Sequence, residues 1–238
     1  MADALASPEC RLRELGLGES ALGAEGGVAL AVGLAANKSL LVVDLNENML
    51  GEKGGAAVSN ALLKNATIRE LQLGSNAFGP EAGAALGRAL QANRSVVELE
   101  LSDNIDLSEA GAVAIAAGLK KNKTLRKLGA TACNLTGNGG VAIAKALEEN
   151  TSLRELLVSS NQLGDEAAVA LAAALKVNTS LSVIQIGQND MSAGAGEALA
   201  EALKANHTVN VLYVGENDFD EATNEALRAA WASESMMA

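Results

Sequence analysis

Hydrophobic residues recur along the chain with a period of 28 residues. Each unit opens on a leucine or an equivalent residue and reads L-x-x-L-x-L-x-x-N-x-L. The spacing of the opening residues is 28, except for one spacing of 29 between Val96 and Leu125. The openings are Leu12, Leu40, Ile68, Val96, Leu125, Leu153, Leu181 and Val209. Eight copies in register predict stacked repeats. We expect the extra residue, Asp106, to bulge in a loop without shifting the strands.

Two hydrophobic periods within each unit predict two elements. The L-x-L pair alternates with period two, which indicates a short strand with one buried face. Further along, a small residue is followed by apolar residues three and seven positions later, as in Gly27, Leu30 and Leu34, which is helical spacing. Strands joined by helical crossovers are parallel. The row two residues after the small position is alanine throughout, and we expect it to be buried: Ala29, Ala57, Ala85, Ala114, Ala142, Ala170, Ala198 and Ala226.

Asparagine recurs at two places in the unit. After the strand we expect its amide to satisfy backbone groups of neighbouring turns. At the end of the helix we expect a left-handed conformation that caps the helix. The first set is Asn48, Asn76, Asn104, Asn161, Asn189 and Asn217, with Ser20 and Cys133 in the two remaining units. The second set is Asn37, Asn65, Asn93, Asn122, Asn150, Asn178 and Asn206, and capping explains the N-x-[ST] sequons found there without glycosylation.

Together these features resemble the ribonuclease-inhibitor-like subfamily of leucine-rich repeats. The repeat length, the helical G-x-A-L-x-x-x-L segment, the Cys133-Asn134-Leu135-Thr136 stretch and the closing N-x-[ST] all match. The resemblance covers residues 12 to about 231. Within the subfamily, the sequence is similar to the repeat regions of NOD-like receptors, Ran GTPase-activating protein and tropomodulin. It implies an α/β solenoid, a right-handed horseshoe of eight β-α repeats with a concave parallel sheet and convex helices.

The ends of a solenoid must cover an exposed core, so we expect them to differ from the interior repeats. Residues 1–11 are too short for a repeat and are predicted to form an N-terminal cap that covers the first strand. Residues 12–208 hold repeats one to seven. Residues 209–238 hold the eighth repeat and a C-terminal cap, in which Trp231 shields the open end.

Composition and charge narrow the range of partners. The chain of 238 residues has a net charge of −11, which argues against nucleic acid and against anionic membrane surfaces. It contains no apolar run of 18 residues, so we expect no insertion into a membrane. The start lacks a secretory pattern and there are only two cysteines, which favours the reducing cytoplasm. The expected partner is a protein with a basic surface.

No group of residues predicts catalysis, a metal site or a cofactor. His207 is the single histidine of the chain, with no cysteine near it in the sequence. The acidic run from Glu216 to Glu221 lacks the glycine turn and the distant glutamate of a calcium loop. The basic run from Lys120 to Lys127 begins at a predicted helix C-terminus, where cations suit the helix dipole. We therefore expect a protein that is not an enzyme.

Residues that flank the buried strand positions face the hollow of the predicted horseshoe. In repeats one to four they include five acidic residues with little opposing charge: Glu14, Asp44, Glu70, Glu98 and Glu100. In repeats six to eight they include an apolar set: Leu157, Val183, Val211 and Tyr213. A tyrosine among exposed aliphatic residues is typical of an interface anchor, although strands favour valine and tyrosine in any case.

The outer helices offer an alternative binding surface. Valine is a mediocre helix former, yet it recurs at an outward position, where a partner packed on the helices would explain it. These residues are Val28, Val113, Val141 and Val169. The pattern as a whole predicts a protein-protein interaction module or scaffold. The alternatives are a regulator of a small GTPase, which the likeness to Ran GTPase-activating protein implies, and a structural subunit of a large assembly.

Overall fold

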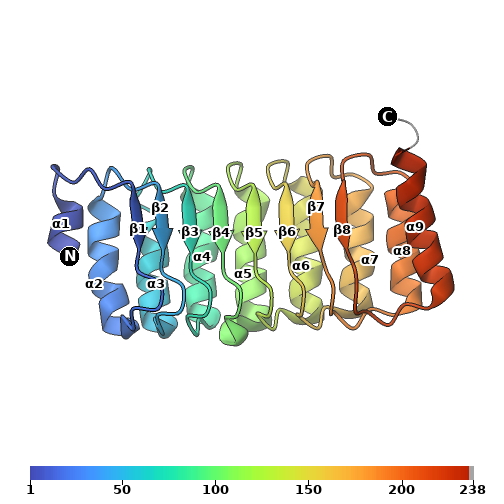
Figure 1. Cartoon of the computed structure of the whole chain (residues 1–238), viewed down its shortest axis with the longest axis horizontal. Coiled ribbons are helices and arrows are strands. Elements are labelled where there is room, and N and C mark those ends of the chain that lie inside the picture. Colours follow the sequence, from blue (N-terminus) through green and yellow to red (C-terminus); the bar gives the residue numbers. More distant parts are fainter. Residues whose placement is uncertain (236–238) are drawn as a thin grey trace.

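The computed structural model describes residues 1–235 and confirms the predicted solenoid of alternating strands and helices (Figure 1). Eight strands form one open parallel sheet in chain order. They are β1 (Glu14–Gly16), β2 (Val42–Asp44), β3 (Glu70–Gln72), β4 (Glu98–Glu100), β5 (Lys127–Gly129), β6 (Glu155–Leu157), β7 (Val183–Gln185) and β8 (Val211–Tyr213). The helices are α1 (Ala2–Ala6), α2 (Gly23–Ala36), α3 (Gly51–Ala61), α4 (Pro80–Ala92), α5 (Ser108–Lys121), α6 (Thr136–Glu149), α7 (Gly164–Leu175), α8 (Ala193–Leu203) and α9 (Glu221–Ser235).

Every strand pairs with the next at equivalent positions of the repeat, and the extra residue of repeat four does not disturb this register. Glu98 of β4 lies opposite Lys127 of β5, as the repeat requires. The additional residue is accommodated in a 3-10 turn, η1 (Ile105–Leu107), where Asp106 is exposed. The predicted bulge in the strand-to-helix loop is therefore confirmed.

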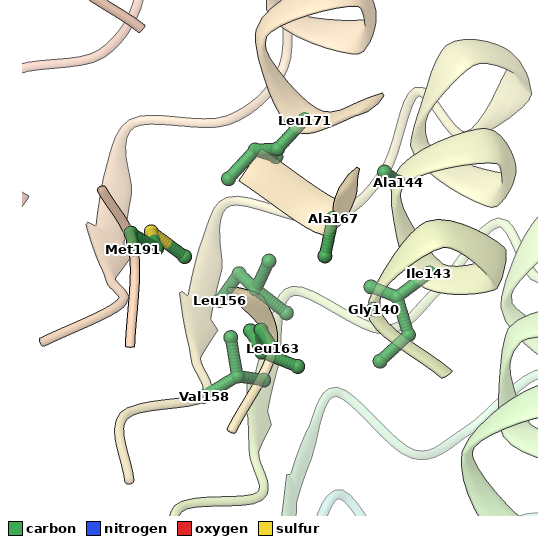
Figure 2. A pocket seen from close by; sticks show the side chains of 9 residues that line it. All are labelled: Gly140, Ile143, Ala144, Leu156, Val158, Leu163, Ala167, Leu171 and Met191. Carbon is green, nitrogen blue, oxygen red and sulfur yellow. The ribbon is translucent and has the colours of Figure 1, made fainter. Parts of the chain in front are cut away.

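The core lies between the sheet and the helices and is built from thin aliphatic layers. Figure 2 shows one layer, in which Leu156 and Val158 of the β6 segment meet Ile143 of α6 and Leu171 of α7. The side chains leave an apolar void of about 20 Å³. A void of this size, lined by hydrocarbon, holds no more than a single water molecule and is a packing defect rather than a ligand site.

Neighbouring helices approach each other through residues that lack bulk. A Cβ added to Gly87 of α4 would lie 2.2 Å from the carbonyl oxygen of Ala114 in α5, and one added to Gly118 would lie 2.3 Å from the carbonyl oxygen of Gly87. The predicted burial of the alanine row was wrong, because only Ala85 is fully buried, Ala29 is exposed and the others are half-buried. Two residues span about 200° of a helix with 3.6 residues per turn, which places that row at the margin of the buried face.

The asparagines that follow the strands form a buried ladder, as predicted. Asn76 Oδ1 accepts hydrogen bonds from the N–H groups of Asn48 (3.2 Å) and Leu50 (3.3 Å), and its Nδ2 donates to the Leu45 carbonyl (2.8 Å). At the position where cysteine replaces asparagine, the buried Cys133 Sγ lies 3.2 Å from the Leu101 carbonyl. The polar residue thus joins each coil to the one before it.

The helix-ending asparagines cap by a different mechanism from the one predicted. Asn93 has φ −68° and ψ 142°, an extended conformation, so the left-handed expectation was wrong. Its Oδ1 accepts from the N–H groups of Ser95 and Val96 at 2.8 Å, and its Nδ2 donates to the Leu62 carbonyl at 2.9 Å. Left-handed residues lie instead in the strand-to-helix loops, as at Glu47 (φ 56°).

The N-terminal segment covers the first helix and not the first strand, which corrects the sequence expectation. α1 lies beside α2 in Figure 1. A Cβ on Gly33 of α2 would meet the Ala2 carbonyl oxygen at 2.8 Å, and Asn37 Nδ2 donates to the Leu5 carbonyl at 2.8 Å. The apolar Leu5 finds its cover in the helix layer, where it is buried. At the other end, residues 236–238 of the predicted C-terminal cap lie outside the described part of the chain.

Candidate protein-binding surfaces

The sheet presents two rows of side chains on the face opposite the helices, which the sequence predicts to be the concave one. In β2, β3, β4, β6 and β7 the central residue is buried while the first and third are half-exposed. This alternation follows from the strand period of two. The residues selected from the sequence as partner-binding therefore lie on this sheet face, in equivalent positions of successive strands.

The acidic zone consists of Glu14, Asp44, Glu70, Glu98 and Glu100 and extends across β1 to β4. Glu70 lies directly opposite Glu98 in the parallel register, so two like charges are neighbours on this face. A shallow hollow of about 200 Å³ is lined by Glu70, Glu98, Glu100 and Lys127, together with Gln72, Leu71 and Leu99. Like charges on adjacent strands repel one another, and a basic partner would relieve that repulsion.

Lys127 of β5 marks the end of the acidic zone and supplies opposing charge. Its Nζ lies 4.0 Å from Glu98 Oε2, and both side chains are partly exposed. Glu100 is held locally, since its Oε1 accepts from the Ser102 N–H at 2.7 Å. Asp44 Oδ1 accepts in the same way from the Asn46 N–H at 2.9 Å. The carboxylates of Glu100 and Asp44 are therefore fixed in direction, and one oxygen of each already accepts a hydrogen bond from the main chain.

The apolar zone consists of Leu157, Val183, Val211 and Tyr213, and the structure brings three of the four together. Val183 lies opposite Val211 in the register of β7 and β8, and Tyr213 follows two residues after Val211. Leu157 is separated from Tyr213 by Gln185 of the intervening strand. Val211 is 46% exposed and Tyr213 is 45% exposed, so both present area that a partner can cover.

Two glycines position the tyrosine ring, and the sequence interpretation had not singled them out as functional. A Cβ on Gly187 would overlap the Tyr213 ring, with Cε1 at 2.3 Å, and a Cβ on Gly215 would lie 3.2 Å from the Tyr213 Oη. The ring therefore lies over the main chain of two neighbouring loops. The sequence shows glycine at both positions after the strand. It does not show that the Tyr213 ring covers Gly215 of its own coil and Gly187 of the preceding coil.

The helix face carries the alternative set. Val113 and Val169 are 45% and 51% exposed, whereas Val28 and Val141 are half-buried. Val32, which is 65% exposed, belongs to an apolar groove of about 600 Å³ between α2 and α3. The groove also contains Val28, Ala31, Ala35, Ala36, Ala57, Ala61, Leu63, Asn60 and Lys64. The outward valines therefore form one groove at the N-terminal end and isolated exposed positions further along.

The titratable groups of the described residues can be compared with what a metal site requires. Among residues 1–235 no three His, Cys, Asp or Glu side chains are placed to share a metal ion. Burial raises the pKa of the Cys133 thiol to about 12. A hydrogen bond from the Ser192 hydroxyl lowers the pKa of Asp165, and hydrogen bonds with Thr223 lower that of Asp220. Within residues 1–235 no helix is both long and apolar enough to cross a membrane.

Comparison with known proteins identifies the repeats. Residues 64–87 and 149–172 match the family model described as leucine-rich repeat. No protein of curated function matches the chain in sequence. A structure of leiomodin-1 actin-binding site 2 superimposes with a TM-score of 0.56 at 18% identity, covering 66% of this chain and 89% of that one. The tropomodulin C-terminal domain of Caenorhabditis elegans gives a TM-score of 0.55 at 15% identity, covering 66% and 94%. At identities this low, the structural similarity supports a shared fold alone.

Proposed function

We propose that this protein is a non-catalytic interaction module that binds a partner protein on its sheet face. The observation that carries the proposal is the division of that face into the acidic zone and the apolar zone on one continuous sheet. Leucine-rich-repeat domains are scaffolds that display side chains for binding, and the similar structure of leiomodin-1 is an actin-binding site. The proposal includes a cytoplasmic location and membership of the ribonuclease-inhibitor-like subfamily, which the repeat length of 28 residues supports.

The two zones have different roles in this proposal. Tyr213 and Val211 are exposed and Val183 is half-buried on a rigid sheet, and such aromatic and aliphatic side chains supply most of the affinity once desolvated. Exposed carboxylates mainly accelerate the encounter with a basic partner, an effect that salt screens. The partner is therefore a protein with a basic surface next to an apolar one.

The test compares proteins retained from a cell extract by the full chain and by three variants, with quantitative mass spectrometry. We expect a retained protein that is lost with Tyr213→Ala, that binds more slowly at low salt with the double variant Glu98→Lys and Glu100→Lys, and that is unaffected by Val113→Glu. If Val113→Glu removes the partner while the two sheet-face variants retain it, the sheet-face proposal is wrong.

The helix face is the second candidate, and the apolar groove between α2 and α3 favours it. Val32 of α2 and Leu63, in the turn after α3, are 65% and 48% exposed on its walls, and neighbouring exposed aliphatic side chains of this kind can mark a binding surface. A partner docked there would respond to Val32→Glu and not to Tyr213→Ala. The same retention assay therefore separates the two faces.

A further inference from the structure

The strand edge at the C-terminal end of the sheet carries main-chain groups that point away from the rest of the molecule. β8 is the last strand and pairs only with β7 among the described residues. The Val211 N–H donates to the Ser182 carbonyl at 3.0 Å, and the Tyr213 carbonyl accepts from the Ile186 N–H at 2.8 Å. Successive residues of a strand bond to opposite sides, so the N–H and the carbonyl of Leu212 point to the open edge.

The backbone N–H groups that join successive repeats show that the β8 edge lacks an acceptor strand among the described residues. In repeats one to seven, the N–H two residues after the strand centre donates to the following repeat, from Leu17 (to Asp44) through to Ile186 (to Tyr213). The Val214 N–H is the eighth member of that row. Within residues 1–235 no strand lies beyond β8 to accept it. The edge therefore has the donors for a further strand in the same register.

The asparagine ladder ends in the same way. Asn217 Oδ1 accepts from the N–H groups of Asn189 (3.0 Å) and Met191 (3.2 Å). The equivalent donors one repeat later are the N–H groups of Asn217 and Phe219, and within residues 1–235 no following repeat supplies the equivalent asparagine to receive them. These donors follow the strand, so an acceptor for them must also follow the strand of whatever pairs with β8.

The apolar side chains of the edge are also left partly uncovered. Leu212 and Val214 are half-buried, although the corresponding strand centres of repeats two to seven are 1% exposed or less. The fully buried strand centres are Val43, Leu71, Leu99, Leu128, Leu156 and Ile184. α9 packs against α8 and so covers the helix layer at this end, while the strand layer stays open (Figure 1).

We infer that the β8 edge binds an extended segment of a partner protein that runs parallel to β8 and carries the pattern apolar-x-apolar-x-x-Asn. Strand addition satisfies the open N–H and carbonyl groups, and alternate side chains select the sequence. The two apolar residues cover Leu212 and Val214. The asparagine oxygen accepts from Asn217 and Phe219, and it lies on the correct side only when the segment is parallel. This edge is distinct from the sheet face and does not depend on the function proposed above.

A peptide copy of residues 181–191, L-S-V-I-Q-I-G-Q-N-D-M, has the required pattern and is the probe. Its binding to the full chain is measured by titration calorimetry, and amide hydrogen exchange locates it. We expect protection of the Leu212 and Val214 amides on binding. In the peptide, replacing the asparagine by alanine removes the acceptor of two hydrogen bonds and should weaken binding about thirtyfold, since each lost hydrogen bond costs about 1 kcal/mol, or roughly a factor of five.

The protein variants separate the edge from the side chains near it. Val214→Pro removes one open donor on an edge that tolerates proline and should weaken peptide binding about fivefold, whereas Val214→Ala keeps the donor and should bind within about twofold of the parent. Unchanged melting temperatures establish that both variants fold. The inference is overturned if the peptide does not bind, if Val214→Pro binds it like Val214→Ala, or if protection appears only at the Tyr213 side of the sheet face. It is also overturned if the chain dimerises through this edge in sedimentation, because the occupant is then a second copy.

Discussion

The two ends of the solenoid differ in how the helix layer and the strand layer are covered. At both ends a helix covers the helix layer, α1 on α2 at the N-terminal end and α9 on α8 at the C-terminal end. The strand layers differ. Both strands have a central leucine, Leu15 in β1 and Leu212 in β8. In β1 it is flanked by Glu14 and Gly16, whereas in β8 it is flanked by Val211 and Tyr213. Charge and glycine on an edge strand discourage pairing, and aliphatic and aromatic residues favour it.

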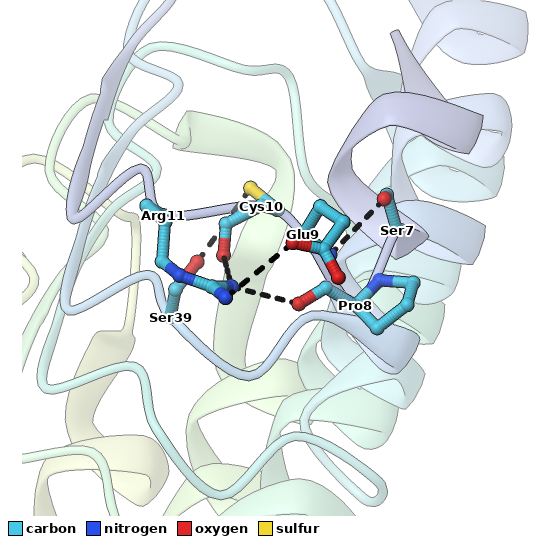
Figure 3. A network of polar contacts seen from close by, with 6 residues as sticks. All are labelled: Ser7, Pro8, Glu9, Cys10, Arg11 and Ser39. Carbon is cyan, nitrogen blue, oxygen red and sulfur yellow. Dashed lines mark hydrogen bonds and ion pairs between the residues drawn. The ribbon is translucent and has the colours of Figure 1, made fainter.

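The difference teaches that closing the helix layer and closing the strand layer are separate tasks in a repeat protein. The N-terminal end adds a polar clasp, shown in Figure 3, in which Arg11 Nη1 donates to the Pro8 carbonyl at 2.8 Å and Ser39 Oγ donates to Cys10 Sγ at 3.6 Å. Asn37 joins this clasp to α1. This clasp belongs to the N-terminal end, whereas the β8 edge at the C-terminal end is the one that we infer to accept another strand.

The largest expected effect concerns the two cysteines, one in the N-terminal clasp and one in the centre of the solenoid. The pKa of Cys10 is lowered, chiefly by the Ser39 hydroxyl, whereas burial raises the pKa of Cys133 to about 12. Only the thiolate reacts, so at pH 8 the Cys133 fraction that can be alkylated is smaller by about a thousandfold or more. Mass spectrometry after iodoacetamide treatment should show Cys10 modified first. Equal rates at the two sites would mean that the centre opens as readily as the end.

Asn37→Ala should have the largest effect on stability at the N-terminal end. The buried amide donates to the Leu5 carbonyl and accepts from the N–H groups of Ser39 (2.9 Å) and Leu40 (2.7 Å). Leaving these buried groups unpaired should lower the free energy of unfolding by about 3 kcal/mol, measured by urea denaturation.

Asn206→Ala is the matched control at the other end, since Asn206 makes the corresponding bonds to Leu175, Thr208 and Val209. Both variants should be destabilised, but only Asn37→Ala should increase amide exchange in α1, because only Asn37 donates to the Leu5 carbonyl. If α1 keeps its protection in Asn37→Ala, the clasp does not depend on this side chain.

Two glycine substitutions give the smallest effects, with opposite signs at the two ends. Gly33→Ala places a methyl group against Ala2 and should destabilise by about 1 kcal/mol through overpacking. Gly194 of α8 has no heavy atom within 4 Å of its added Cβ, so Gly194→Ala should stabilise by about 0.5 kcal/mol through helix propensity. Thermal unfolding of the two variants measures the contrast. A stabilised Gly33→Ala would show that α1 is not packed tightly on α2.

The repeat period determined most of the architecture without the tertiary structure. Every coil needs the same inward residues to cover its neighbours, so the spacing of leucines specified the strand positions, the parallel order and the place of the extra residue near Asp106. The same alternation was enough to place Asp44, Glu98 and Tyr213 on one face of the sheet.

Tertiary structure decided the features that depend on contacts between neighbouring coils. Lys127 ends the acidic zone because β5 pairs with β4. Gly187 positions the Tyr213 ring because the ring extends from β8 over the loop of the preceding coil. α1 covers the helix layer, and the alanine row lies at the margin of the buried face, because helix phase and docking are set by packing. The sequence pattern shows which residues are apolar. Only the packing of neighbouring coils decides which side chain each apolar residue contacts, and which strand edge is unpaired among the described residues.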